Sequence, residues 1–179
     1  MQGIYKLQIC GLERDLPLCP LNNELSIAAF VIFGDVELTI AAASELLQRV
    51  SEFDYIVTPE AKSIPLAYEL SRQSGKKYLV ARKKAKLYMR SPVSVHVRSI
   101  TTEGVQTLML DSVEGELLRG KRVLIADDVI STGESLAAIE ALCEKFGAEV
   151  IAKAAILAEG EAINRKDITV LGELPIFCN

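Results

Sequence analysis

Two adjacent carboxylates, Asp127 and Asp128, follow five mostly apolar residues at 122–126 and precede a run of hydroxyls and glycine. A Val/Leu/Ile run of this kind predicts a strand that is buried on both faces, as in a parallel sheet. The later run predicts a turn and a helix start, whose free N–H groups and positive dipole end suit a phosphate. Its residues are Ser131, Thr132, Gly133, Glu134 and Ser135. The whole pattern predicts a site for a ligand that carries both hydroxyls and phosphate.

The carboxylate pair by itself has three interpretations: a metal site, a pair of acceptors for ribose hydroxyls, or a solvated strand end. Residues 131–133 favour the second, because carboxylates accept hydrogen bonds from vicinal hydroxyls while the amides and hydroxyls that follow enclose a monophosphate. The chain has neither the G-x-G-x-x-G of dinucleotide-binding proteins nor the G-K-[ST] of Walker phosphate loops. Both of these classes are therefore excluded.

The elements that must position these residues alternate along the chain. Apolar runs predict strands at 53–58, 78–81, 122–126 and 150–157, and helical spacing of apolar residues predicts helices at 36–50, 64–74 and 132–146. This alternation predicts an α/β fold with a central parallel twisted sheet flanked by helices. Strands at 93–100 and 105–110, joined by a turn, predict a hairpin outside that sheet. Residues 5–21 predict short edge strands or an N-terminal attachment.

Three polar segments directly follow three of the predicted strands: 60–63, 82–86 and 127–135. In open α/β sheets, ligands bind outside the carboxyl ends of the strands. We therefore expect the three segments to meet at one edge of the sheet. The second segment belongs to a basic cluster at 76–90, which alone would be read as a solvated loop. Its position after a core strand favours a role in anion binding instead.

Composition limits the kinds of function that the chain can have. The chain has 179 residues, half of them hydrophobic and a quarter charged, which is typical of one globular domain with a sizeable core. The net charge of −4 argues against a broad nucleic-acid surface. No signal peptide or membrane-length apolar run is evident, and the four cysteines lack metal-binding spacing. We expect a cytoplasmic protein with reduced thiols and no membrane or nucleic-acid partner.

The sequence V-L-I-A-D-D-V-I-S-T-G-E-S at 123–135 resembles the phosphoribosyl-pyrophosphate motif of type I phosphoribosyltransferases. Three other stretches resemble the adenine phosphoribosyltransferases of that family. D-Y-I-V at 54–57 and E-A-K-S at 60–63 resemble a strand and its E-A-R-G loop. R-K-K-A-K-L at 82–87 resembles R-K-x-G-K-L, and G-V-Q-T-L-M-L at 104–110 resembles the strand leaving a flexible loop. The resemblance covers about residues 29–158. It implies a single domain over 1–179, in which 1–28 and 159–179 form a small hood and the hairpin carries the flexible loop.

The resemblance implies a purine phosphoribosyltransferase of purine salvage, with adenine as the favoured base. Asp127 and Asp128 would then hold the ribose hydroxyls of phosphoribosyl pyrophosphate (PRPP) and act in catalysis. Ser131, Thr132, Gly133, Glu134 and Ser135 would enclose its 5′-phosphate. Mg²⁺ is the implied cofactor, held mainly through PRPP, with the two aspartates as candidate ligands.

The resemblance also assigns the pyrophosphate end of the ligand and an assembly. The residues expected to meet the pyrophosphate are Glu60, Ala61, Lys62, Ser63, Arg82, Lys83 and Lys86. The loop at 94–106 would close over the site and exclude water. Such enzymes are often dimers, so we expect a homodimer in which the basic residues could also serve the neighbouring subunit.

Three departures from the family pattern leave turnover and the base open. Glu134 stands where the adenine enzymes usually have glycine. Pointing inward, its charge would weaken binding of the expected 5′-phosphate, whereas pointing outward it would offer only its backbone N–H. Thr102 occupies the place of the loop's acidic residue, so Glu103 becomes the candidate for that catalytic role. The base-recognition stretch F-P-K-P-G-I is not matched at 20–24. A regulatory PRPP- or nucleotide-binding protein without turnover, and a transferase for another base, are therefore the alternative hypotheses.

Outside these segments, three titratable residues are weaker candidates for a role. His96 lies on the polar side of a predicted strand, without a nucleophile or acid beside it in sequence, and is expected at the surface. Glu159 and Glu161 follow the last core strand, where such folds often place residues that recognise the base. A surface role is the simpler expectation for His96, and the absence of a role in base recognition is the simpler one for the two glutamates.

Overall fold

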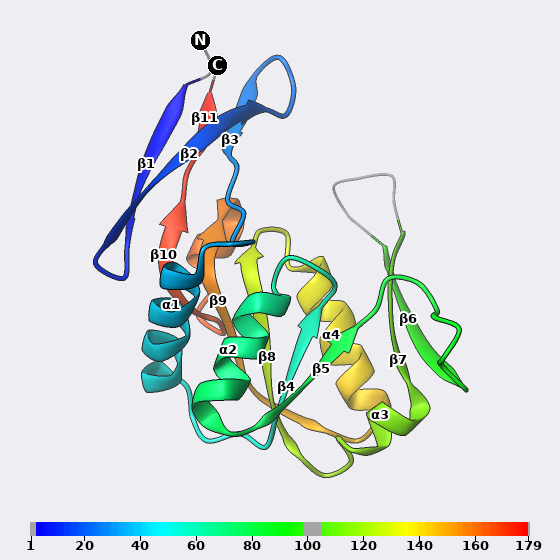
Figure 1. Ribbon diagram of the computed structural model, residues 1–179. Coiled ribbons are helices and arrows are strands. Elements are labelled where there is room, and N and C mark those ends of the chain that lie inside the picture. Colours follow the sequence, from blue (N-terminus) through cyan, green and yellow to red (C-terminus); the bar gives the residue numbers. More distant parts are fainter. Residues whose placement is uncertain (1–2, 99–104, 179) are drawn as a thin grey trace.

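The computed structural model of the protein describes residues 3–98 and 105–178. Its centre is a five-stranded sheet with the strand order β10-β9-β8-β4-β5, in which every neighbouring pair is parallel (Figure 1). The strands are β4 (Tyr55–Pro59), β5 (Lys77–Ala81), β8 (Arg122–Ile130), β9 (Glu149–Glu159) and β10 (Thr169–Leu174). The predicted α/β fold with a central parallel sheet is confirmed.

Three main helices accompany this sheet: α1 (Val36–Arg49), α2 (Ile64–Ser74) and α4 (Glu134–Lys145). The side chain of Asp35 accepts the Leu38 N–H and caps the N-terminus of α1. The α4 helix begins at Glu134 rather than at the predicted Thr132. The reason is Gly133, whose φ of +78° is left-handed and cannot continue a right-handed helix.

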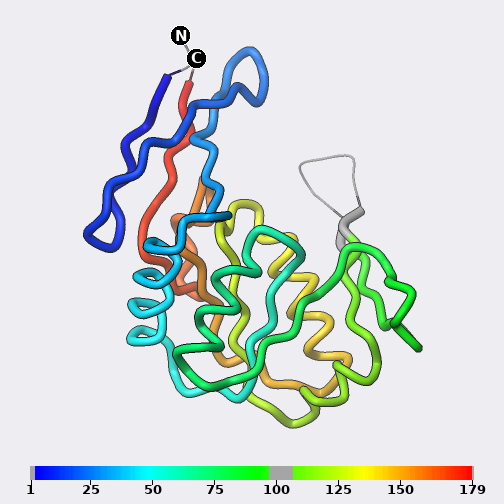
Figure 2. Tube along the Cα trace, in the orientation of Figure 1, coloured from blue at the N-terminus to red at the C-terminus, as the bar shows by residue number. Residues whose placement is uncertain are grey.

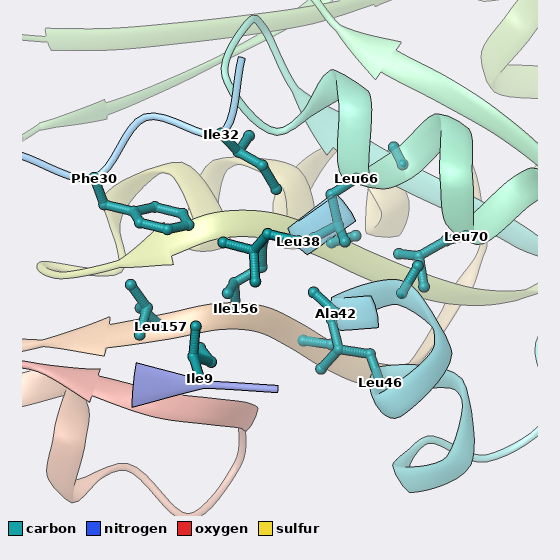
Figure 3. Packing of buried hydrophobic residues seen from close by; sticks show 14 of the residues in the cluster. Ile9, Phe30, Ile32, Leu38, Ala42, Leu46, Leu66, Leu70, Ile156 and Leu157 are labelled. Atoms are coloured by element: carbon teal, nitrogen blue, oxygen red, sulfur yellow. The ribbon is translucent and has the colours of Figure 1, made fainter. Parts of the chain in front are cut away.

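Two apolar layers cover the two faces of the sheet. Side chains alternate along β8, so that Leu124 and Ala126 join the layer under α1 and α2, while Val123 and Ile125 join the layer under α4. Figure 3 shows the first layer, with Leu38 of α1 next to Ile156 of β9 and with Ala42 and Leu46 farther along the same helix. All four of these β8 side chains are fully buried, which confirms a central strand covered on both faces.

The two ends of the chain build a separate antiparallel sheet that we call the hood. Its strands are β1 (Ile4–Ile9), β2 (Leu12–Pro20), β3 (Leu25–Ala28) and β11 (Ile176–Cys178), in the order β1-β2-β3-β11. Figure 2 shows how the first and last segments of the chain run side by side above one end of the main sheet. Leu7, Ile9 and Leu16 of the hood are buried in the same apolar layer as α1.

The hairpin predicted outside the main sheet is present. It consists of β6 (Pro92–Arg98) and β7 (Val105–Asp111), which pair antiparallel. Val95, Leu108 and Leu110 are buried in the layer that contains α4. The short helices α3 (Ser112–Glu116) and η1 (Gly160–Asn164) complete the described elements. Among the residues that the structure describes, no helix is long and apolar enough to cross a membrane.

An ion pair fastens the hood to the start of α1, and its removal should loosen the hood. Arg14 of β2 contacts both carboxylate oxygens of Asp35, at 2.6 and 3.0 Å, and Glu37 at 2.8 Å. We expect Arg14→Met to lower the midpoint of thermal unfolding by roughly 2–6 °C at pH 7. The matched control is Lys6→Met, because Lys6 forms an exposed pair with Glu13 within the hood and should contribute little.

The effect of Arg14→Met should depend on pH with a defined sign. The Arg14 guanidinium, followed by the Leu38 N–H, holds the pKa of Asp35 below its usual value. A lowered pKa means that the stabilisation is present above the ordinary carboxyl pKa and is lost as pH falls through the folded-state pKa. Unfolding midpoints of both proteins should therefore converge at acidic pH. A difference that stays constant down to about pH 3 would contradict the assignment.

Candidate active site

The site lies where two neighbouring strands of the main sheet part. β4 pairs with β8 from Tyr55–Val123 to Val57–Ile125, but not beyond, whereas β4 continues to pair with β5 as far as Pro59. β8 itself runs on to Ile130, held by β9 alone. Asp127 and Asp128 lie two and three residues beyond Ile125, the last β8 residue that pairs with β4. The sheet therefore opens beside the two carboxylates, at the carboxyl ends of its strands, where α/β folds bind ligands.

The two aspartates are both buried, with relative exposures of 8% for Asp127 and 4% for Asp128. The Asp128 N–H donates to Asp127 Oδ1 at 2.9 Å. Burial, and then the neighbouring Asp128 carboxylate, raise the pKa of Asp127 well above its usual range, while Lys62 acts in the opposite direction. Asp128 Oδ2 is buried and accepts no hydrogen bond from the residues that the structure describes, although Lys62 Nζ lies 3.3 Å from it. A buried acceptor of this kind is suited to hydroxyl donors of a ligand.

The loop at 60–63 faces the carboxylates across a cavity of about 210 Å³. The residues that line it are Pro59, Glu60, Ala61, Lys62, Ser63, Lys83, Asp127, Asp128, Val129 and Ser135. All of the predicted segment 60–63 thus lines the cavity, together with four residues of 127–135 and with Lys83 of the third segment. The Ser63 hydroxyl is turned away from this cavity's chemistry, because it is buried and bonded to Thr58 Oγ1 and the Pro59 carbonyl, both at 2.9 Å. From Ser63 only the backbone remains for a ligand.

The Glu60 carboxylate contacts the three basic residues that were expected to bind pyrophosphate, Arg82, Lys83 and Lys86. Arg82 Nη1 and Lys86 Nζ lie 3.3 and 3.4 Å from Glu60 Oε1, and the Lys83 N–H donates to Oε2 at 3.1 Å. The Lys83 N–H, then Lys86 and Arg82, lower the pKa of Glu60. Arg82 is further fixed by two backbone hydrogen bonds with Met109 of β7. The basic segment is therefore anchored beside the cavity, and its side chains Arg82 and Lys86 are paired with Glu60.

A second, smaller cavity of about 80 Å³ adjoins the first at the start of α4. It is lined by Asp127 and by the residues from Val129 to Leu136, which include all five of the predicted phosphate-binding residues. The cavity lies at the N-terminus of α4, and the N–H groups and positive dipole end of a helix N-terminus suit a phosphate. A residue outside the prediction also approaches: a Cβ placed on Gly133 would lie 2.5 Å from Arg165 Nη1.

The remaining sequence candidates fall into different places. Glu159, at the end of β9, is half-buried, and burial raises its pKa while the charge of Lys62 lowers it, so it belongs to the surroundings of the cavity. Glu161 is exposed. His96 is exposed on β6, as expected, with its Nδ1 2.8 Å from Thr107 Oγ1. Glu103 and Thr102 lie outside the described residues.

Comparisons with known proteins agree with this geometry. Over 129 residues the chain is 36% identical to a hypoxanthine/guanine phosphoribosyltransferase of Methanococcus voltae, a match that spans 71% of this chain but 65% of that relative. It is 32% identical to an adenine phosphoribosyltransferase of Thermosipho africanus, over 87% of this chain and 89% of the relative. The crystal structure of adenine phosphoribosyltransferase from Rhodothermus marinus superposes with a TM-score of 0.64, at 25% identity, over 77% of this chain and 78% of that one.

The structure has the type I phosphoribosyltransferase fold. Its features are a parallel five-stranded sheet, a terminal antiparallel hood, and a carboxylate pair followed by a loop that lines a small cavity. The model of the phosphoribosyl transferase domain family matches residues 35–173. The chain belongs to this family. The resemblance in the sequence to this class of glycosyltransferase, and to its adenine branch, is confirmed.

Proposed function

We propose that the protein transfers the 5-phosphoribosyl group of PRPP to a nitrogen of a purine base and releases pyrophosphate. The observation that carries the proposal is the pair of adjoining cavities, which share Asp127, Val129 and Ser135. One is lined by the start of α4 and suits the 5′-phosphate. The other lies between the carboxylates and the 60–63 loop and suits the ribose and the pyrophosphate. Purine salvage is the process that such a reaction serves.

In the proposed reaction, the chain's own groups position PRPP and stabilise charge. Asp127 and Asp128 accept hydrogen bonds from the ribose hydroxyls and orient the ring. Lys62 and Lys83 line the same cavity and face the departing pyrophosphate, whose negative charge grows as the glycosidic carbon becomes cationic. Arg82 and Lys86 can also contact the pyrophosphate oxygens if their ion pairs with Glu60 open. Catalysis then comes mainly from positioning and electrostatic stabilisation.

Mg²⁺ fits the donors of this site as a ligand shared with the substrate. The described residues contain no cluster of three side chains that could hold a metal ion by themselves. Asp127 and Asp128 nevertheless supply carboxylate oxygens, and Mg²⁺ prefers oxygen ligands completed by phosphates. One of these oxygens, Asp128 Oδ2, accepts no hydrogen bond from the described part of the chain. When bound, the ion would reduce the charge of the leaving pyrophosphate. Glu103 stays a prediction as the acid or base of the loop.

The favoured base is adenine, because the adenine stretches in the sequence match those loops that here border the cavity. The hypoxanthine/guanine enzyme among the relatives makes the oxopurines the first competitors. Pyrophosphate release should be measured with PRPP, Mg²⁺ and each of adenine, hypoxanthine, guanine, xanthine, uracil and orotate. We expect the highest kcat/KM with adenine. Faster turnover of an oxopurine would reassign the base but keep the reaction.

The same assay separates the enzyme from a regulatory protein on this fold. Glu134 beside the phosphate cavity is the feature that favours regulation, because its charge opposes that of a phosphate. Calorimetric binding of PRPP without pyrophosphate release from any base would support that alternative and refute the enzyme. The homodimer and the cytoplasmic location stay predictions from the sequence and the resemblance. Sedimentation analysis would test the homodimer.

A further inference from the structure

Arg165 lies far from the phosphate-binding loop in sequence but touches it in space. It follows η1, the short helix after β9, and its backbone N–H donates to the Ala162 carbonyl. Its Nη1 reaches so close to Gly133 that a Cβ there would sit at 2.5 Å, a contact that a side chain cannot make. Gly133 is also the residue that caps α4, with a φ of +78°. The guanidinium therefore borders the one backbone position where the loop has no side chain.

Arg165 is held in this orientation by a network of charged groups. Its Nε and Nη2 donate to the two oxygens of Asp167, at 2.9 and 2.6 Å. Lys153 of β9 donates to Asp167 at 2.8 Å and to Glu140 of α4 at 2.6 Å. The fixed bonds use Nε and Nη2, so Nη1 is the nitrogen that faces the loop. The network ties the arginine both to the sheet and to the helix that starts at the phosphate cavity.

Arg165 can supply a positive charge that the residues of the phosphate-binding loop lack. The loop 131–135 has no Lys or Arg of its own, and it carries Glu134. A phosphate dianion there would meet one carboxylate of the loop and the nearby Asp127. Backbone N–H groups offset part of this repulsion, and a cation next to the loop offsets more, because charges interact strongly at partly buried sites. Arg165 is 31% exposed, which is partly buried.

We infer that Arg165 is part of the 5′-phosphate subsite, where it supplies the positive charge and holds the loop at Gly133. The inference rests on the proposed function, since it concerns the same ligand. Its specific content is that Arg165 serves the 5′-phosphate and not the pyrophosphate. The pyrophosphate cavity is lined by other cations, Lys62 and Lys83.

The test compares Arg165→Gln and Arg165→Lys with the wild-type protein. Binding of ribose 5-phosphate and of pyrophosphate with Mg²⁺ is measured separately by calorimetry. We expect Arg165→Gln to bind ribose 5-phosphate about ten-fold more weakly, with pyrophosphate affinity unchanged, and Arg165→Lys to be weakened less. Arg119→Gln is the matched control: Arg119 makes the same two-bond pair with Glu116, at 2.8 and 2.6 Å, after α3, and should bind both ligands normally.

The outcomes separate this inference from the proposed function. Wild-type binding of both ligands with an unchanged affinity of Arg165→Gln for ribose 5-phosphate would overturn the role of Arg165 alone. Equal weakening of both ligands, with a lowered unfolding midpoint, would make Arg165 a structural residue and also overturn it. A wild-type protein that binds neither ribose 5-phosphate nor PRPP would refute the proposed function together with the inference.

Discussion

Replacing both buried aspartates, by Asp127→Asn with Asp128→Asn, is expected to abolish measurable PRPP binding while the protein stays folded. Each amide keeps one acceptor oxygen but adds an NH₂ donor, which cannot accept from a ribose hydroxyl. The double change also removes both negative charges that would attract the Mg²⁺ complex of PRPP. We expect kcat/KM to fall by at least about 10³-fold, the size of effect seen when a key electrostatic contact is lost. Calorimetry with PRPP and Mg²⁺ measures the binding directly.

The same variant should be at least as stable as the wild-type protein at neutral pH. Burial and the Asp128 charge raise the pKa of Asp127 in the folded state. A raised carboxyl pKa means that the folded state loses stability as pH rises through that pKa, because the buried group must then ionise. The two amides of the variant do not ionise and carry no such cost. Thermal unfolding at pH 5 and pH 8 should therefore show a smaller loss of stability with rising pH in the variant.

Asp54→Asn is the matched control at the opposite end of the sheet, just before β4. Arg122, at the start of β8, contacts the Asp54 carboxylate through its side chain and its N–H, and together these lower the pKa of Asp54 to about 2. This aspartate stabilises the fold when ionised, so Asp54→Asn should lower the unfolding midpoint at neutral pH and leave PRPP affinity intact. Retention of PRPP affinity within about three-fold by the Asp127/Asp128 variant, a change of under 1 kcal/mol, would refute the proposed site.

The main sheet and the central motif of the site could both be predicted from the sequence. The alternation of apolar runs and helical patterns predicted the main sheet. Its central strand β8 is buried on both faces, and such a strand appears in the sequence as a continuous apolar run. The motif around Asp127 was also readable, since strand, carboxylates and phosphate loop are contiguous in the chain. The residue pattern alone predicted only edge strands at the N-terminus, and a hood built from both ends was implied by the family resemblance, because the pairing of β3 with β11 joins segments far apart in the chain.

The meeting of the three polar segments could be predicted, but the individual side-chain contacts between them could not. The carboxylate of Glu60 pairs with Arg82 and Lys86, which no local sequence pattern reveals, while the role of the 60–63 loop in pyrophosphate binding stays a prediction. Arg165 gave no signal at all, because its proximity to Gly133 depends on how the chain returns after β9. The start of α4 was placed two residues too early, because spacing of apolar residues cannot detect a left-handed glycine.

Lys62 is the cation whose removal should most change the pH dependence of the reaction. Its Nζ lies 3.3 Å from Asp128 Oδ2, and its charge lowers the pKa values of both Asp127 and Glu159. Without it, burial acts on both carboxyls with less opposition, and their pKa values rise further. If Asp127 must be ionised to bind the ribose, the acidic limb of the kcat/KM profile of Lys62→Met should move to higher pH.

The size of the loss should also depend on pH. Lys62→Met removes a pyrophosphate contact as well as the charge beside Asp128, so we expect kcat/KM near pH 7 to fall about 10²-fold. The loss should shrink at higher pH, where Asp127 ionises in both proteins. Stability should change little, because the Lys62 side chain is 52% exposed and solvent screens its pair with Asp128. Lys62→Arg, which keeps the charge, should retain the wild-type profile.

Lys83→Met separates the two roles that Lys62 is given. Lys83 lines the same cavity, but its charge is not among the influences on the pKa of Asp127 or of Glu159. Its loss should weaken pyrophosphate binding without moving the acidic limb. A Lys62→Met profile that is lowered evenly at every pH, like that of Lys83→Met, would show that Lys62 contacts pyrophosphate only. A shifted limb in Lys62→Met alone would instead trace the limb to a carboxyl whose pKa Lys62 lowers, which is Asp127 or Glu159. Glu159→Gln separates these two carboxyls, because the charge of Lys62 also lowers the pKa of Glu159. The acidic limb of Glu159→Gln should stay at the wild-type pH if Asp127 is responsible for it.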